Sequence, residues 1–443
     1  MEFIDNQEEL KTLVEDILKE ARRQGADQSE VSVSMDQGLG VSVRKGSLEN
    51  LEFNQDRGFG ITLYFGHRKG SASTTDSSRE AIAATVSAAR DIARHTQDDE
   101  CSGLAEPELM PEQAADLDLY HPWEITPEAA TEIAIGCEAA GLAVDARLKN
   151  SDGAEVSSQQ SIRVYGNSHG FIGAYAGTRH SLSCVLIGED ASGMQRDYWY
   201  TQARSHQDME DALTVGRIAG ERTAGRLSPR SAPTGSFPVL FAAPQAAGLI
   251  GHLVGAIGGS AQYRKATFLL DALGEQVLPK WLTLKEHPLR PKALGSAYFD
   301  ADGVATRENT FISEGILDSY ALSVYSGKKL ARATTGNAGG VHNLELMGAA
   351  ESFENLLSRV DKGLYVTELM GQGVNSVTGD YSRGAAGYWV EDGKIQYPVD
   401  ELTIAGNLRD MYLNVLAMGD DADRRGNILS PSLLIERMTI AGQ

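Results

Sequence analysis

The sequence predicts an α+β protein of two domains, in which hairpin-rich mixed or antiparallel sheets are covered by helices. Its 443 residues are enough for two or three domains that each bury a core. Many short runs alternate apolar and polar residues between glycines, which is typical of half-buried strands joined in hairpins. The predicted helices do not alternate with single strands, so the sequence shows no βαβ rhythm of a nucleotide-binding fold.

The first quarter of the chain predicts a helix, a set of strands and a second helix. Asp5 and Glu8 form a capping-box pattern ahead of an apolar helical stripe. Three alternating runs with glycine-rich breaks then predict antiparallel strands: 31–35, 40–46 and 58–66. Ser77 and Glu80 predict the cap of the second helix. An acidic, aperiodic stretch over 96–124 is expected to be a surface connection.

The middle of the chain repeats this pattern and ends in a change of composition. Thr126 is a predicted N-cap, and the proline after it favours the first turn of a helix. Alternation returns over 160–188. Proline, glycine and serine are then concentrated at 228–238. This segment predicts a linker between an N-terminal domain, 1–227, and a C-terminal domain, 239–443.

The second half of the chain is expected to be rich in strands. It opens with a predicted strand that leads into a helix beginning at Pro244. Asp302 with Gly303, and Asp392 with Gly393, stand between alternating runs and predict two tight hairpins, because this dipeptide suits turns with positive φ angles.

The charge of the chain disfavours direct binding of nucleic acid. Forty Lys and Arg residues stand against 61 Asp and Glu residues, so the net charge is −21 and the average field repels phosphate backbones. The densest basic groups are isolated pairs, which we interpret as solvated surface. We therefore expect no nucleic-acid partner.

Cysteine content and the N-terminus favour a cytoplasmic protein that does not enter a membrane. The three cysteines show no CxxC spacing, which fits a reducing compartment. The N-terminus is acidic and lacks the basic and apolar regions of a secretory signal. Residues 231–263 carry no formal charge, but prolines and glycines interrupt them. We interpret this stretch as a buried strand and helix.

Glycine-rich motifs that could suggest catalysis or phosphate binding are better explained as turns. Gly166 to Gly170 matches the G-x-S-x-G pattern of serine hydrolases, but the residues that follow alternate like a strand where that chemistry needs a helix. Ser168 is therefore not expected to be a nucleophile. Three further pairs complete no phosphate-binding motif and are expected in turns and bulges: Gly38 with Gly40, Gly58 with Gly60, and Gly371 with Gly373.

Four longer segments resemble one protein family. They are GHLVGAIGGSAQYRKATFLLDALGEQ at 251–276, TTGNAGGVHNLEL at 334–346, TGDYSRGAAGYWVEDGKIQYPV at 378–399 and SLLIERMTIAG at 432–442. On these segments the chain resembles the TldE (PmbA) branch of the TldD/TldE family, peptidase U62, once described as modulators of DNA gyrase. The resemblance covers nearly the whole chain and is densest after residue 230.

The resemblance also exposes a departure from the metal-binding chemistry of the TldD branch. That branch carries a helix with an HExxxH pattern, in which two histidines bind zinc and the glutamate handles the proton of the attacking water. In one alignment register, Gly251, His252 and Ala256 replace these three residues. In the other register, His252 replaces the first histidine, while Leu253 and Ile257 replace the other two. The cysteine that completes the TldD site near the C-terminus is missing as well.

The resemblance therefore implies no metal and no catalytic residue in this chain, with zinc expected in a partner subunit. Candidates for a substrate chamber or a subunit interface are His252, Tyr263, Arg264, Lys265, Asn337, Gly339, Gly340 and His342. The glycines of the loop at 334–342 would let the backbone approach a bound peptide closely, although a tight structural turn is the simpler interpretation. A single histidine on an apolar helix is more often hydrogen-bonded in a core or interface.

By resemblance, the chain is expected to be the supporting subunit of a cytoplasmic zinc metalloprotease. A TldD-like catalytic subunit would be its partner, and the heterodimer would enclose a chamber for unstructured peptides, with this chain as a pseudoenzyme that forms part of the wall. Two alternatives stay open. One is an autonomous, homodimeric peptidase with an unrecognised site; the other is a regulator of gyrase or of a toxin–antitoxin system that acts without proteolysis.

Overall fold

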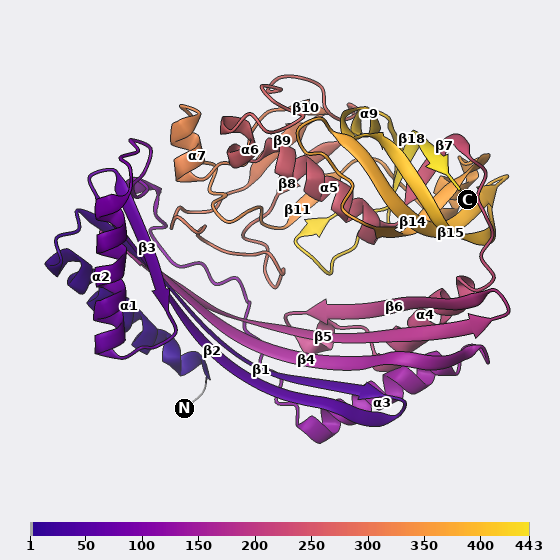
Figure 1. Cartoon of the computed structure of the whole chain (residues 1–443), viewed down its shortest axis with the longest axis horizontal. Helices are drawn as coiled ribbons and strands as arrows, with labels where there is room; N and C mark the ends of the chain where they lie inside the picture. The colour runs from indigo at the N-terminus through magenta and orange to yellow at the C-terminus, as the bar shows by residue number, and fades with distance from the viewer. Residues whose placement is uncertain (1–2, 443) are drawn as a thin grey trace.

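The computed structural model describes residues 3–442 and has an α+β fold built in two halves (Figure 1). The first half contains one six-stranded antiparallel sheet in the order β3-β2-β1-β4-β5-β6. Its elements are α1 (Asn6–Arg23), β1 (Gln28–Arg44), β2 (Ser47–Phe65), β3 (Arg68–Thr74), α2 (Arg79–His95), α3 (Pro127–Leu142), β4 (Leu148–Asn167), β5 (Ile172–Asp190), β6 (Gly193–Ala203) and α4 (Ala212–Gly225).

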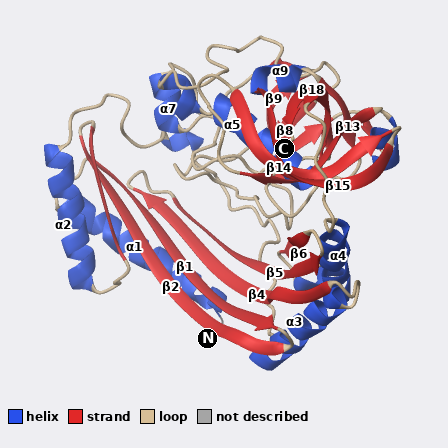
Figure 2. Ribbon diagram, turned by 45° about the vertical axis from the view of Figure 1, so that its right-hand side comes forward, coloured by secondary structure: helices blue, strands red, loops and turns tan. Residues whose placement is uncertain are grey.

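All four helices cover the same face of this long, curved sheet. Along β1, Val31 and Val33 pack in a core with α1 and α2, while Val41 and Val43 pack in a second core with α3 and α4. These residues have odd numbers, and side chains two positions apart in a strand point to the same side. The opposite, concave face of the sheet is therefore free of helices and faces the second half of the chain (Figures 1 and 2).

The second half consists of two sheets around one large core. The larger sheet has the order β12-β16-β18-β15-β14-β13-β7, and an additional pairing of β18 with β7 closes five of its strands into a ring. The smaller sheet has the order β10-β9-β8-β11-β17. Three strand pairs are parallel, namely β13 with β7, β11 with β17 and β12 with β16, so both sheets are mixed.

The elements of the second half begin with a strand and the helix that the sequence analysis singled out. They are β7 (Gly235–Phe241), α5 (Ala243–Ile257), α6 (Gly259–Tyr263), β8 (Thr283–Glu286), β9 (Asn309–Ser313), β10 (Ile316–Leu317), α7 (Val324–Lys329), β11 (Leu344–Met347), β12 (Ala350–Glu351), α8 (Phe353–Ser358), β13 (Lys362–Met370), β14 (Asp380–Glu391), β15 (Lys394–Asn407), α9 (Leu408–Leu413), β16 (Val415–Gly419), β17 (Ile428–Leu429) and β18 (Leu433–Ala441). No helix among residues 3–442 is long and apolar enough to cross a membrane.

Several local predictions are confirmed. Thr126 caps α3, because its side chain accepts a hydrogen bond from the backbone N–H of Ala129 at 3.2 Å. Asp392 and Gly393 join β14 to β15 in a hairpin with φ angles of 49° and 70°. Ser168 lies in the turn between β4 and β5, where its hydroxyl accepts a hydrogen bond from the backbone of Ser29.

Other local predictions are wrong, and the sheet supplies the reason. The glycines at 38 and 40 lie inside one continuous strand, β1, instead of at a break. A Cβ atom on Gly38 would come within 1.9 Å of the Gln159 side chain, which crosses from β4. Gly58 and Gly60 likewise lie inside β2. Gly38, Gly58 and Gly60 leave room for side chains of neighbouring strands, and none of the four glycines ends a strand.

Four further local details differ from the expectation. The cap of α2 is Ser78, one residue after the predicted Ser77, and the Asp5 side chain makes no capping hydrogen bond to α1. Gly303 lies in a turn held by backbone hydrogen bonds and an isolated bridge between Phe299 and Ala305, so no hairpin of two extended strands forms there. The predicted linker 228–238 overlaps β7, which begins at Gly235.

Candidate functional site

Helix α5, which contains the segment compared above with the expected metal-binding helix of the TldD branch, presents a half-buried histidine in an apolar setting. Pro244 lies in the first turn of the helix, as the sequence predicts, and the inner face is packed into the large core. The ring of His252 meets the ring of Tyr381 edge to face, with centroids 6.3 Å apart. Burial lowers the pKa of His252, and the positive charge of Arg383 lowers it further. The imidazole is therefore held neutral at physiological pH.

The residues around His252 do not fit a zinc ion. Gly251, Ala256 and Ile257 have no side-chain atom that can coordinate a metal, and Ala256 and Ile257 are buried in the core. A nearby guanidinium would repel a divalent cation. Across the described part of the chain, no group of three or more His, Cys, Asp or Glu side chains is arranged to hold a metal ion.

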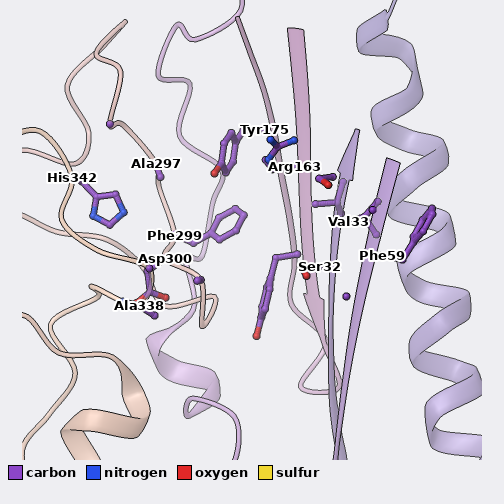
Figure 3. A pocket seen from close by; sticks show the side chains of 18 of the residues that line it. Ser32, Val33, Phe59, Arg163, Tyr175, Ala297, Phe299, Asp300, Ala338 and His342 are labelled. Atoms are coloured by element: carbon purple, nitrogen blue, oxygen red, sulfur yellow. The ribbon is translucent and has the colours of Figure 1, made fainter. Parts of the chain in front are cut away.

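A cleft of about 1080 Å³ lies between the two halves of the molecule. One wall of the cleft is the concave face of the first sheet, with Ser32 from β1 and Arg163 from β4. The other wall comes from two loops of the second half, over 294–301 and 338–342. Figure 3 shows Asp300 and His342 on these loops, across the cleft from the strands that carry Ser32 and Val33. Side chains far apart in the sequence therefore share one cavity.

The buried carboxylate of Glu286, at the end of β8, holds the loop that carries His342. Glu286 is only 1% exposed. Its Oε1 accepts hydrogen bonds from the Asn337 side chain at 2.8 Å, from the backbone N–H of His342 at 2.5 Å, and lies 3.2 Å from Nδ1 of His342. Its Oε2 accepts from Asn309 at 2.8 Å. The carboxylate thus fixes both the path of the loop and the orientation of the imidazole.

Asp300 places an acidic group in the cleft wall. Its Oδ1 accepts hydrogen bonds from the backbone N–H groups of Asp302 and Val304, and its Oδ2 accepts one from Ala338, each at 2.9 Å. Burial raises the pKa of Asp300 to about 6, and the negative charge of Asp302 adds to this effect. The carboxyl group can therefore gain or lose a proton near neutral pH.

The opposite side of the cleft carries two guanidinium groups. Arg163 forms a paired contact with the carboxylate of Asp36, at 2.8 and 3.0 Å. Arg204 donates hydrogen bonds to the backbone oxygens of Thr178 and Leu294, and so links the two halves. Burial lowers the pKa of Arg204 to about 10. The cleft thus has two guanidinium groups on its sheet side, one of them paired with Asp36, and the carboxyl group of Asp300 on its loop side.

The candidate residues predicted from sequence fall into separate places. Gly339 and His342 line the cleft, and Asn337 supports it from behind through Glu286. Gly339 and Gly340 have φ angles of 92° and 124°, in the left-handed region that favours glycine. The remaining candidates lie on α5 or at and just after the end of α6: His252, Tyr263, Arg264 and Lys265.

The candidates that follow α5 form a small aromatic and cationic group of their own. The ring of Tyr263 contacts the ring of Tyr325 edge to face at 5.7 Å, and the guanidinium of Arg264 lies 5.6 Å from the ring centre of Tyr263. Lys265 has a φ angle of 55°, which a residue just beyond a helix end can adopt. The described residues that line the cleft do not include any of these three.

Sequence reasoning missed the charged residues of the cleft. Arg163 occupies a polar position of an alternating strand and Asp300 precedes a predicted turn, so each looked locally ordinary. Glu286 lies 51 residues from Asn337 and 56 residues from His342, and no local pattern connects them. One sequence feature could have indicated the buried network: Glu286 is a charged residue at a position of an alternating strand where an apolar residue is expected.

Three domain models of one protein family match nearly the whole chain. Residues 29–93 match PmbA/TldA metallopeptidase domain 1, residues 120–227 match the central domain, and residues 234–442 match the C-terminal domain of the same metallopeptidases. The three matches follow one another in the order of the chain.

Individual relatives agree with these matches. The chain is 51% identical to Metalloprotease PmbA of Escherichia coli O157:H7, over 94% of this chain and 93% of the relative. It is 45% identical to the Metalloprotease PmbA homolog of Haemophilus influenzae, over 98% and 97%. Its fold is similar to the crystal structure of a "putative modulator of DNA gyrase" from Bacteroides thetaiotaomicron, with a TM-score of 0.93, 27% identity and coverage of 99% and 100%.

Proposed function

The chain belongs to the PmbA/TldD family of metallopeptidases, and on that premise we propose that it is the supporting, TldE-like subunit of a zinc metalloprotease. A TldD-like partner would supply the metal and the general base. One observation carries the proposal: α5 offers His252 alone, next to Arg383, where zinc binding needs several anionic or neutral ligands. When bound in the partner, zinc would activate the attacking water.

The part assigned to this chain is to bind and orient the peptide substrate. The cleft has a volume of about 1080 Å³, and His342 and Asp300 line its loop side as polar groups. Arg163 on the sheet side is paired with Asp36 but remains partly exposed, so its guanidinium can contact a polar group of the peptide. Because charged groups of both signs stand on opposite walls, the cleft suits chains of mixed sequence and sets no single side-chain preference.

Loop geometry supports binding of peptide backbone in particular. Gly339 has no side chain, so its backbone amide and carbonyl are open to the cleft, while the buried Glu286 keeps the loop in place. A fixed backbone wall of this kind can pair with an extended segment without reading its sequence. We propose unstructured peptides as the substrates, because an extended segment can pair with such a wall through its backbone.

The test is to incubate an unstructured peptide with this purified chain, with a TldD-like chain, and with both, and to follow cleavage by mass spectrometry. The proposal predicts cleavage only in the mixture, and loss of cleavage when a chelator removes zinc. Substitution His252→Ala in this chain should leave the activity of the mixture unchanged.

Two results would contradict the proposal. Chelator-sensitive cleavage by this chain alone, abolished by His252→Ala, would indicate an autonomous peptidase with its own site. Full activity of the TldD-like chain without this chain would leave it no supporting role. A cellular effect on gyrase or on a toxin–antitoxin pair that persists without any cleavage would favour a regulator instead.

A further inference from the structure

The rim of the first sheet presents an open strand edge. Strand β2 pairs with β1 along its whole length, but β3 covers only its second part, from Phe59 to Phe65. Residues 47–56 are all exposed. Figures 1 and 2 show β2 at the border of the sheet near α3, with no strand beyond it. The outward N–H and C=O groups of this stretch are free to pair with another chain.

One side of this open edge is apolar. Leu48, Leu51 and Phe53 are 51%, 48% and 67% exposed, so Phe53 is among the most exposed large apolar side chains of the described residues. Leu51 lies opposite Val41 and Phe53 lies opposite Leu39 in the pairing with β1. These partners belong to the core under α3 and α4. Apolar side chains therefore extend from that core beyond the helices that cover it, and there they are exposed to solvent.

The other side of the edge is acidic. Asn50, Glu52, Asn54 and Asp56 alternate with the apolar residues and point to the concave face. On the neighbouring strand, Asp36 lies opposite Asp56, but its carboxylate is already paired with Arg163. Among the described residues, Glu52 accepts a hydrogen bond from the neutral side chain of Asn50 at 2.9 Å and forms no ion pair. Negative charge on this side thus lacks a nearby cation to balance it.

We propose that the open edge of β2 is a docking site for an extended strand of another protein, whose side chains alternate between apolar and basic. The backbone of that strand would extend the sheet beyond β2. Its apolar side chains would cover Leu51 and Phe53, and its Lys or Arg side chains would lie beside Glu52 and Asp56. No proteolytic role of the cleft is needed for this binding.

Charge favours such a partner over a second copy of this chain. Two copies of the edge could pair antiparallel with Leu51 against Phe53 in both directions. That register places Glu52 directly opposite the Glu52 of the other copy, and like charges directly opposite destabilise a strand pair. A strand that carries basic residues at these positions gains attraction from the same carboxylates.

The first test measures binding of two blocked, fluorescent nine-residue peptides to the full chain by anisotropy. One peptide alternates valine and lysine, and the other alternates valine and glutamate. The lysine peptide should bind at least tenfold more tightly, and Phe53→Ser should weaken its binding at least tenfold. Glu52→Gln should reduce the preference for lysine. Leu213→Ser, at a 61% exposed position on α4, is the matched control and should change nothing.

The second test identifies the binding mode on the unaltered protein. Two versions of the lysine peptide carry N-methyl groups on alternate residues, so that each loses every second N–H donor. In strand addition only one set of N–H groups faces the edge, so one version should lose binding and the other should keep it. Equal binding by both versions, or equal loss by both, would overturn the proposal.

Two other results would also overturn it. The lysine and glutamate peptides could bind with equal affinity, which would remove the role of the acidic side. Alternatively, the wild-type chain could form dimers in size-exclusion chromatography that Phe53→Ser converts to monomers, while no peptide binds. That outcome would assign the edge to a second copy of this chain.

Discussion

Two histidines of this molecule, His252 on α5 and His342 on the cleft loop, have opposite surroundings. His252 lies beside an aromatic ring and the guanidinium of Arg383, and both burial and that charge lower its pKa. His342 lies 3.2 Å from the carboxylate of Glu286 and lines the cavity between the two halves. The first is held neutral in an apolar place, whereas the second is oriented by a buried anion and faces open space.

The difference shows that position in a family motif does not decide what a histidine can do. His252 occupies the segment where relatives of the TldD branch are expected to bind metal, yet its neighbours oppose a cation. His342 occupies a glycine-rich loop with no catalytic pattern, yet a carboxylate holds its ring in one orientation. Neighbours brought by the fold therefore determine the chemistry of each ring.

The largest expected effect concerns the buried carboxylate of Glu286, which holds the loop that carries His342. Substitution Glu286→Gln puts an amide donor against the donors of Asn337 or Asn309, inside the protein. We expect a loss of about 3 to 5 kcal/mol in the free energy of unfolding, as for a broken buried network. Urea denaturation would measure it, and hydrogen exchange should rise in the loop at 334–342.

The control for this substitution is Glu308→Gln. Glu308 also contacts a histidine, His287, at 3.0 Å, but its side chain is 60% exposed. We expect almost no change in its free energy of unfolding. If both glutamines were equally harmless, the carboxylate of Glu286 would not be the support of the loop.

The acidic wall of the cleft can be tested through the pH dependence of stability. The native-state pKa of Asp300, about 6, lies above its ordinary value near 4. Between these values the native state keeps a proton that the unfolded state loses, so the contribution of Asp300 is complete below about pH 4 and disappears as the pH rises through 6. Two units correspond to at most about 3 kcal/mol.

The substitution Asp300→Asn should remove this dependence. Urea denaturation between pH 4 and 7 would compare its slope with that of the wild type, and the wild type should lose more stability as the pH rises. Asp145→Asn is the control, because hydrogen bonds from Arg147 lower the pKa of Asp145 to about 2, outside this range. Identical slopes for wild type and Asp300→Asn would show that Asp300 titrates normally.

The two histidines are also expected to differ in their effect on peptide binding. His342→Ala should weaken binding of an unstructured peptide to this chain about tenfold, which corresponds to about 1.4 kcal/mol, because one oriented hydrogen-bonding group of the cleft is lost. His252→Ala should leave the affinity unchanged, since that ring lies outside the cleft. Isothermal titration calorimetry measures both. A larger effect of His252→Ala would reverse the assignment of the two rings.

The smallest expected effect concerns the hydroxyl of Tyr381 near α5. The hydroxyl of Tyr381, next to His252, is buried and makes no hydrogen bond to the described residues, so Tyr381→Phe should change the free energy of unfolding by less than about 0.5 kcal/mol. Tyr412→Phe is the matched control. Its hydroxyl donates to the backbone oxygen of Leu249 at 2.6 Å, and its loss should cost about 1 kcal/mol. Thermal unfolding of the two variants would separate these cases.

Local features of the fold could be predicted because their causes lie within a few residues. Thr126 caps the third helix through an N–H only three residues away, and Asp392 with Gly393 adopts positive φ angles that few other residue pairs tolerate. The glycine at 38 misled the prediction, because its reason lies on another strand, at Gln159. A glycine that makes room for a distant side chain looks the same in sequence as one that forms a turn.

The sequence by itself determined the α+β class, the main helices, several strands and the absence of metal-ligating side chains at Gly251, Ala256 and Ile257 in the family's metal-binding segment. Only the tertiary structure decided that Glu286 meets His342, that Arg163 faces Asp300 across a cavity, and that the edge of β2 stays open. The physical reason is range. Helix caps and tight turns depend on contacts between near neighbours in the chain, whereas buried networks, clefts and sheet edges depend on which distant segments the cores bring together.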